Sequence, residues 1–120
     1  MNLEKDLTVR ERDGVTIVRF NVEGLLGHEV ELLSARVRAL IENGARKLVL
    51  DFKHVKFAGS AVLGMLLALS KHATAMGGKL ILSHTEHIEA LFKVSRSERM
   101  FTLAPDAKAA VEMFNGPPAD

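Results

Sequence analysis

The sequence predicts an α/β domain with a mixed β-sheet, in the element order β-β-α-β-α-β-α-β-α. Short apolar runs rich in branched side chains alternate with longer segments of helical periodicity, as in parallel strands joined by helical crossovers. A turn signal near the N-terminus joins two strand-like runs and adds an antiparallel pair. The 120-residue chain can build one core, and its four predicted helices could all cover one face of the sheet.

The first elements are a hairpin and a long helix. Apolar residues alternate with polar ones from Leu7, Asp13-Gly14 predicts a tight turn, and residues 15–20 are rich in β-branched side chains. A glycine-punctuated loop then leads to a helix at roughly 28–42, which Asn43-Gly44 ends. The apolar residues of this helix recur at helical spacing: Val30, Leu33, Val37, Leu40 and Ile41.

The middle of the chain predicts two buried strands around an apolar helix. Residues 47–52 form a short apolar run of the kind found in central parallel strands. After a loop at residues 53–59, Ser60 begins an almost wholly apolar helix, and Gly77-Gly78 ends it. Residues 79–82 form another apolar run and predict the next buried strand.

The last third of the chain predicts a helix, a short strand and a final helix. Ser83 or Thr85 could cap the first of these helices, with Glu86 completing a capping box. Residues 100–103 predict a short strand, and Pro105 suits the first turn of the final helix. The expected inward-facing residues are Ile88, Leu91 and Phe92 in the first helix, and Ala110, Val111 and Phe114 in the second.

Composition and length narrow the class of protein. Lys and Arg number 16 against 15 Asp and Glu, and a net charge of +1 does not favour binding to nucleic acid or to an anionic membrane surface. The longest uncharged run, residues 57–70, is shorter than the roughly 20 residues of a membrane span. The absence of cysteine agrees with a reducing, cytoplasmic location. We expect a single domain over residues 1–114 and a flexible tail over residues 115–120.

Signatures of enzymes and metal sites are absent from the sequence. The segment 59–64 lacks the glycine spacing of a nucleophile elbow, and no phosphate-binding Gly-Lys-Ser/Thr loop occurs. Asp51 with His54, and His84 with His87, offer only pairs of metal ligands, whereas a metal site needs three or four. We therefore expect surface histidines, with no metal, no cofactor and no catalysis.

Ser60 is the one residue with two plausible chemical roles. Helix N-termini have unpaired N–H groups and a partial positive charge, so its hydroxyl could serve as a helix cap. Alternatively, the helix terminus would stabilise a phosphate at this position, and the local surface would change from apolar to anionic. A partner that docks on Phe57, Ala58 and Val62 would then be repelled.

Two segments, Leu48 to Phe52 and Val55 to Gly64, resemble the signature of STAS domains, and in particular that of bacterial anti-sigma factor antagonists. Residues 75–80, residues 88–95 and the opening hairpin fit the same family. The resemblance implies a mixed β-sheet of four to five strands with four helices mainly on one face.

The resemblance also implies a function in transcription regulation. In this family, the unphosphorylated protein sequesters an anti-sigma factor with serine kinase activity and so frees the sigma factor. The kinase phosphorylates the serine at the start of the second helix, which by alignment is Ser60. The partner-binding residues implied here are Phe57, Ala58, Gly59, Ser60 and Val62, together with Gly24 and Gly27 of the loop after the second strand.

The sequence departs from the family pattern beside the phosphorylation site. The family usually reads Asp-Ser-Ser/Thr-Gly-Leu where this chain has Gly59-Ser60-Ala61-Val62-Leu63, and it has an Asp about where Gly27 stands. The loss of both acidic groups leaves open a non-phosphorylated STAS scaffold, or a subunit of a signalling complex or transporter. A third alternative is a nucleotide-binding domain lined by Gly24, Gly27 and Gly59. A free sheet edge would also allow a homodimer.

Overall fold

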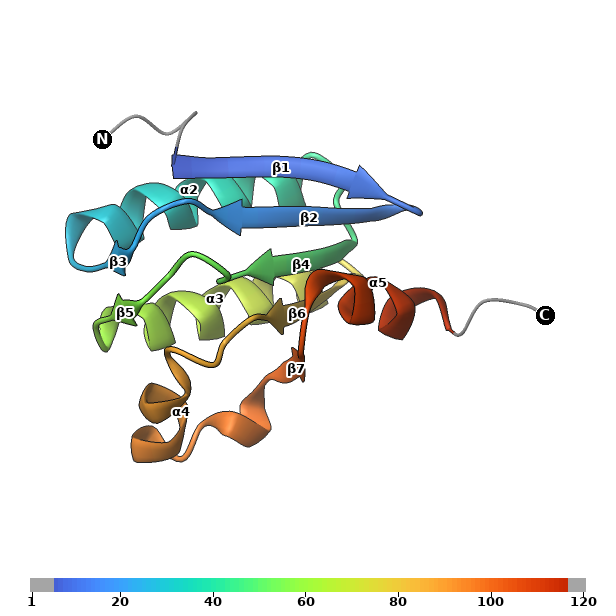
Figure 1. Cartoon of the computed structure of the whole chain (residues 1–120). Helices are drawn as coiled ribbons and strands as arrows, with labels where there is room; N and C mark the ends of the chain where they lie inside the picture. Colours follow the sequence, from blue (N-terminus) through green and yellow to red (C-terminus); the bar gives the residue numbers. More distant parts are fainter. Residues whose placement is uncertain (1–5, 117–120) are drawn as a thin grey trace.

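The computed structural model describes residues 6–116, which form a β-sheet with helices packed on both faces (Figure 1). Five strands make the main sheet in the spatial order β1-β2-β4-β6-β7. In chain order the described elements are β1 (Leu7–Arg12), β2 (Val15–Phe20), β3 (Gly24–Leu25), α2 (His28–Glu42), β4 (Lys47–Asp51), β5 (Phe57–Ala58), α3 (Ala61–Ala75), β6 (Lys79–Ser83), α4 (Glu89–Ser95), a 3-10 helix (Glu98–Met100), β7 (Thr102–Ala104) and α5 (Ala107–Asn115).

The sheet is mixed, as the sequence predicts. β1 and β2 run antiparallel, and the pairs β2–β4, β4–β6 and β6–β7 are parallel. Asp13 and Gly14 join the hairpin and both have positive φ, which a type I′ turn requires at its two central positions. The predicted α/β class and the mixed sheet are therefore confirmed.

Successive residues of the central strands point into two different cores. Leu48 and Leu50 of β4 are fully buried and pack in the same cluster as Leu66 of α3. Val49 lies between them, points to the opposite face and packs in a second cluster with Val111 of α5. Helices α2, α3 and α4 thus cover one face and α5 covers the other. Helices lie mainly on one face as expected, but the alternative that all four share that face is wrong.

Helix α4 begins later than the sequence predicts. Ser83 is still the last residue of β6, and the Thr85 carbonyl accepts a hydrogen bond from the Ile88 backbone N–H at 2.9 Å. This turn precedes the helix, which starts at Glu89 without a side-chain cap. The predicted capping box is therefore wrong, because β6 extends through the serine that would have formed it.

The final helix is held at both ends by side-chain hydrogen bonds. Asp106 Oδ1 accepts from the backbone N–H three residues on, at 2.7 Å, so Pro105 precedes the helix instead of lying in its first turn. Asn115, expected to begin a flexible tail, is the last residue of α5. Its side chain donates to the Asp13 carbonyl and accepts from Lys47 Nζ, each at 2.9 Å. The predicted tail beyond residue 116 lies outside the described residues.

A second, two-stranded sheet lies at the carboxyl end of the main one. β3 and β5 pair in parallel, and Figure 1 shows them beside the first turns of α2 and α3. Parallel strands end at the same edge, so the chain that leaves β2 and the chain that leaves β4 meet here. This end of the molecule gathers the residues that the sequence singles out.

A partly buried ion pair fixes the carboxyl end of β4. Asp51 has no exposed surface, and its Oδ2 accepts a hydrogen bond from Arg19 Nε at 2.9 Å. Its Oδ1 accepts from the Lys53 backbone N–H at 3.1 Å. The carboxylate therefore ties β2 to β4 and shapes the start of the loop that leads to β5.

Substitution of Arg19 and substitution of Asp51 should both destabilise the fold, but by different amounts. Arg19→Met leaves a buried carboxylate uncompensated and should lower the free energy of unfolding by about 3 kcal/mol. Asp51→Asn removes the charge itself and should cost less, about 1.5 kcal/mol. Equilibrium unfolding in urea at neutral pH measures both, and a smaller loss for Arg19→Met than for Asp51→Asn would contradict the assignment.

Gly78 permits a close approach between two loops, because a Cβ atom there would collide with the backbone of Arg46. We expect Gly78→Ala to lower the free energy of unfolding by about 1–3 kcal/mol through overpacking. Gly64→Ala is the matched control, since Gly64 lies within α3 beside open space and alanine there should stabilise by up to about 1 kcal/mol. Chemical denaturation of the two variants should give changes of opposite sign.

A candidate partner-binding surface

Backbone hydrogen bonds hold the loop after β2 against the loop after β4. The Glu23 carbonyl accepts from the N–H groups of Lys56 and Phe57, at 2.7 and 3.1 Å. The Gly59 N–H donates to the Leu25 carbonyl at 3.0 Å. Leu25 is fully buried and anchors the ribbon in the core. Both loops therefore form one rigid surface at this end of the sheet.

Phe57 lies across a glycine on this surface. A Cβ atom on Gly24 would overlap the Phe57 ring, so the ring can lie over β3 only because position 24 has no side chain. Phe57 is nevertheless 52% exposed, and Leu26 is 49% exposed. Gly59 accommodates Leu26 in a similar way, since its Cβ would lie only 3.1 Å from Leu26 Cδ2. The two glycines thus serve close packing, which does not favour the nucleotide-binding alternative.

Ser60 is exposed at the start of α3, and the helix does not use its hydroxyl. It is the cap residue by position, but its backbone is helical (φ −61°, ψ −23°) and its side chain makes no capping hydrogen bond among the described residues. The first turn closes through the backbone, where the Leu63 N–H donates to the Ser60 carbonyl at 3.0 Å. The interpretation of Ser60 as a side-chain cap is therefore wrong.

The other residues expected at the site are only partly brought together. Ala58 and Gly59 are half-buried beside Ser60, whereas Gly27 is exposed at the start of α2 with φ +52°. Gly27 lines a separate hollow between α2 and α3. Val62 is fully buried in the main core. Its expected contact with a partner is wrong, because the helical phase of α3 turns it inward.

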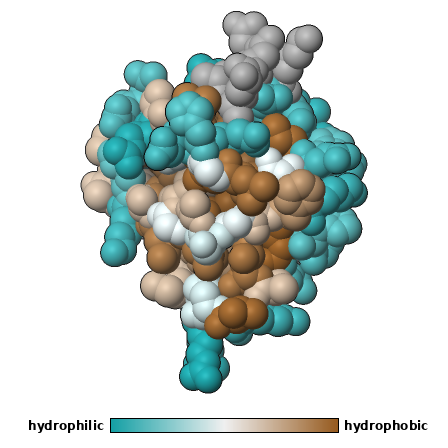
Figure 2. Space-filling model, turned by 90° about the vertical axis from the view of Figure 1, so that its left-hand side faces the viewer, coloured by the Kyte–Doolittle hydropathy of each residue, from teal (hydrophilic) through white to brown (hydrophobic). Residues whose placement is uncertain are grey.

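An apolar groove next to Ser60 does not follow from the sequence pattern. It has a volume of about 410 Å³ and lies between the start of α3 and helix α4. None of the described residues that line it carries a carboxylate, an ammonium or a guanidinium group: Phe57, Ala58, Ser60, Leu63, His87, Ile88, Ala90, Leu91, Val94 and Ser95. Figure 2 shows this end of the molecule, with hydrophobic residues gathered in the centre and hydrophilic ones around them.

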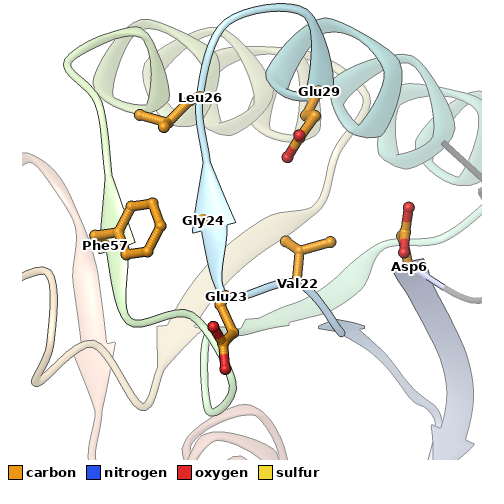
Figure 3. A pocket seen from close by; sticks show the side chains of 7 residues that line it. All are labelled: Asp6, Val22, Glu23, Gly24, Leu26, Glu29 and Phe57. Atoms are coloured by element: carbon orange, nitrogen blue, oxygen red, sulfur yellow. The ribbon is translucent and has the colours of Figure 1, made fainter.

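A second hollow, of about 480 Å³, lies on the other side of Phe57 (Figure 3). Phe57 and Leu26 form one wall, and Asp6 and Glu29 lie opposite them. Glu23 stands at the lower rim. Acidic side chains are therefore the only charged groups among the described residues that line this hollow.

Five histidines lie at or near the surface of the described part of the chain. Residues 6–116 contain no group of three or more His, Asp or Glu side chains that could hold a metal ion. His84 Nδ1 lies 3.4 Å from Glu86 Oε1 in the turn before α4. The backbone N–H of Glu86 and, to a lesser extent, His84 lower the pKa of the Glu86 carboxyl below its usual value. Within the same residues, each helix is too short or too polar to cross a membrane.

Comparison with known proteins identifies the family. The family profile described as the STAS domain matches residues 6–110. The chain is 28% identical over 110 residues to the Bordetella bronchiseptica protein named "Putative anti-sigma factor antagonist BtrV", covering 90% of this chain and 93% of that protein.

Solved structures share the fold. The Thermotoga maritima protein tm1081, described as "a putative anti-sigma factor antagonist", has a TM-score of 0.80 at 21% identity, over 91% of this chain and 94% of that one. The anti-sigma factor antagonist SpoIIAA in its unphosphorylated form has a TM-score of 0.77 at 18% identity, over 94% and 99% of the two chains. The resemblance drawn from the sequence is thus confirmed, and the chain belongs to the STAS domain family.

Proposed function

We propose that this protein is an anti-sigma factor antagonist, which binds an anti-sigma factor and so releases a sigma factor for transcription. The surface around Ser60 is the contact. Family membership and the likeness to BtrV support this function. The observation that carries it is the half-exposed Phe57 ring, held over Gly24 beside the exposed Ser60. The function is one of binding and not of catalysis, and it is exercised in the bacterial cytoplasm.

Phosphorylation of Ser60 by a kinase-type anti-sigma factor is the proposed switch. The hydroxyl is exposed, and the α3 N-terminus beside it favours an added negative charge. The neighbouring side chains of Phe57 and Leu63 are apolar, so a phosphate would bring a charge to a groove whose described lining has no carboxylate, ammonium or guanidinium group. A partner surface that buries these apolar groups would then have to desolvate a dianion.

Gly59 and Gly27 stand about where the family pattern has acidic residues, so neither position offers a carboxylate beside Ser60. A glycine has no side chain that could orient the Ser60 hydroxyl, so the groups that position it must lie elsewhere on the surface. We therefore propose that recognition of Ser60 depends on the apolar surface around it. Loss of a flanking carboxylate then does not by itself prevent the transfer of phosphate.

A homodimer stays a prediction, with β1 and β7 as the two edge strands of the main sheet. β1 exposes Arg10, Glu11 and Arg12, and charged side chains on an edge oppose pairing with another chain. The proposed function requires a single copy of the protein only.

Ser60 variants test the switch against the anti-sigma factor encoded nearest to this gene. We expect the unmodified protein and Ser60→Ala to bind it, and Ser60→Asp to bind at least about tenfold more weakly, because a charge enters an apolar contact. Stability should change by less than about 0.5 kcal/mol in both variants, since the hydroxyl has no structural role. Calorimetry measures affinity, and mass spectrometry after incubation with ATP locates the phosphate.

Two outcomes would count against this function and its switch. If neither the unmodified protein nor Ser60→Ala binds the anti-sigma factor, the protein is not its antagonist. If binding occurs and phosphate appears on another residue, the antagonist function stands and the assignment of Ser60 fails.

Phe57 variants test the contact surface itself. Phe57→Ala should weaken binding to the anti-sigma factor at least about tenfold, because half-exposed aromatic side chains are frequent binding hot spots. Its stability should fall by only about 1 kcal/mol. Gly24→Ala should weaken binding as well, because its methyl group displaces the ring. Met113→Ala is the matched control, since Met113 on α5 is also half-exposed, and an equal loss of affinity in this variant would refute the surface.

A further inference from the structure

We propose that the surface around Phe57 recognises an amphipathic segment whose apolar side chains fill the groove between α3 and α4 and whose Lys or Arg side chain enters the acidic hollow. This inference depends on the proposed function in one respect only, which is that the partner is an anti-sigma factor. It extends the contact surface beyond Ser60 to helix α4 and to three carboxylates.

The groove is suited to an apolar helical segment. Its α4 wall is made by Leu91 and Val94, which are three residues apart and therefore share one face of the helix. Val94 is 86% exposed, although valine is usually buried. Leu63 and Phe57 form the opposite wall. A single exposed apolar residue needs no explanation, but a continuous patch across two elements is typical of a binding groove.

The hollow on the other side of Phe57 is suited to a cationic side chain. Asp6, Glu23 and Glu29 give it negative charge, and no basic residue within the described part of the chain lines it. These carboxylates are not grouped closely enough to hold a metal ion. The Phe57 ring and Leu26 offer an apolar wall for the methylene groups of Lys or Arg, and the ring face attracts a cation.

Phe57 belongs to both cavities, so a single bound segment can contact both. The charge of the lining changes from neutral on the α4 side to negative on the α2 side, across the width of one ring. This asymmetry selects the chemistry of the partner, because a segment with an acidic end would be repelled from the hollow. It also sets the direction in which the segment lies.

Model peptides test this inference without the anti-sigma factor. The probes are a short helical peptide of leucine and lysine and its counterpart of leucine and glutamate, each titrated into the isotope-labelled protein and followed by NMR. We expect only the leucine–lysine peptide to shift signals of Leu63, Leu91 and Val94 together with those of Glu23 and Glu29. Equal binding of the leucine–glutamate peptide, or shifts elsewhere on the protein, would overturn the proposal.

Paired variants separate the two halves of the surface. Val94→Glu should weaken binding of the leucine–lysine peptide at least about tenfold. The double substitution Glu23→Gln with Glu29→Gln should also weaken binding of the peptide and make its affinity less dependent on salt. Met113→Glu and Glu112→Gln, both on the exposed side of α5, are the matched controls and should leave binding unchanged.

The same variants, tested with the anti-sigma factor, distinguish failure of this inference from failure of the proposed function. If the anti-sigma factor binds and Val94→Glu has no effect on its affinity, the inference fails and the antagonist function stands. If the peptide binds as expected and the anti-sigma factor does not, the surface stands and the antagonist function fails.

Discussion

Burial of the central strands on both faces is the constraint on which the rest of the structure depends. β4 and β6 pack against α2 and α3 through one set of alternate residues and against α5 through the other. Strands covered in this way expose neither face to a ligand, so a binding surface must lie at their ends. Because β2, β4 and β6 are parallel, the connections that follow them all begin at one edge. The β3–β5 ribbon and the turn before α4 are those connections.

The same constraint explains why much of the fold follows from the pattern of residues. A strand buried on both faces requires an unbroken apolar run, and Leu48-Val49-Leu50 and Leu80-Ile81-Leu82 meet this requirement in runs too short for a helix of ordinary length. The long helices are equally clear, since their apolar periodicity extends over several turns. Glycines with positive φ, Gly44 and Gly77, mark where α2 and α3 end. The local sequence does not show which face of the sheet each helix covers, because tertiary packing places α5 on the face opposite the other helices.

Short elements are where local reasoning fails. Ser83 and Glu86 have the spacing of a capping box, but pairing of β6 with β4 and β7 holds Ser83 in the strand. Its hydroxyl is buried there without a hydrogen-bond partner among the described groups. The groove could not be found from the local sequence, because its walls come from α3 and α4, which β6 separates along the chain and tertiary packing brings together. Val62 illustrates the converse, since it adjoins the exposed Ser60 and Ala61 yet faces the core.

The unused hydroxyl at the start of α3 has a consequence for how long the protein persists. A serine that caps its helix contributes to stability, so chemical change at that oxygen would alter the fraction of unfolded molecules and with it the exposure to proteases. Here the first turn closes through backbone groups, and the side chain points to solvent. If Ser60 is phosphorylated as proposed, the modified form therefore loses no capping hydrogen bond, and its turnover need not rise on that account.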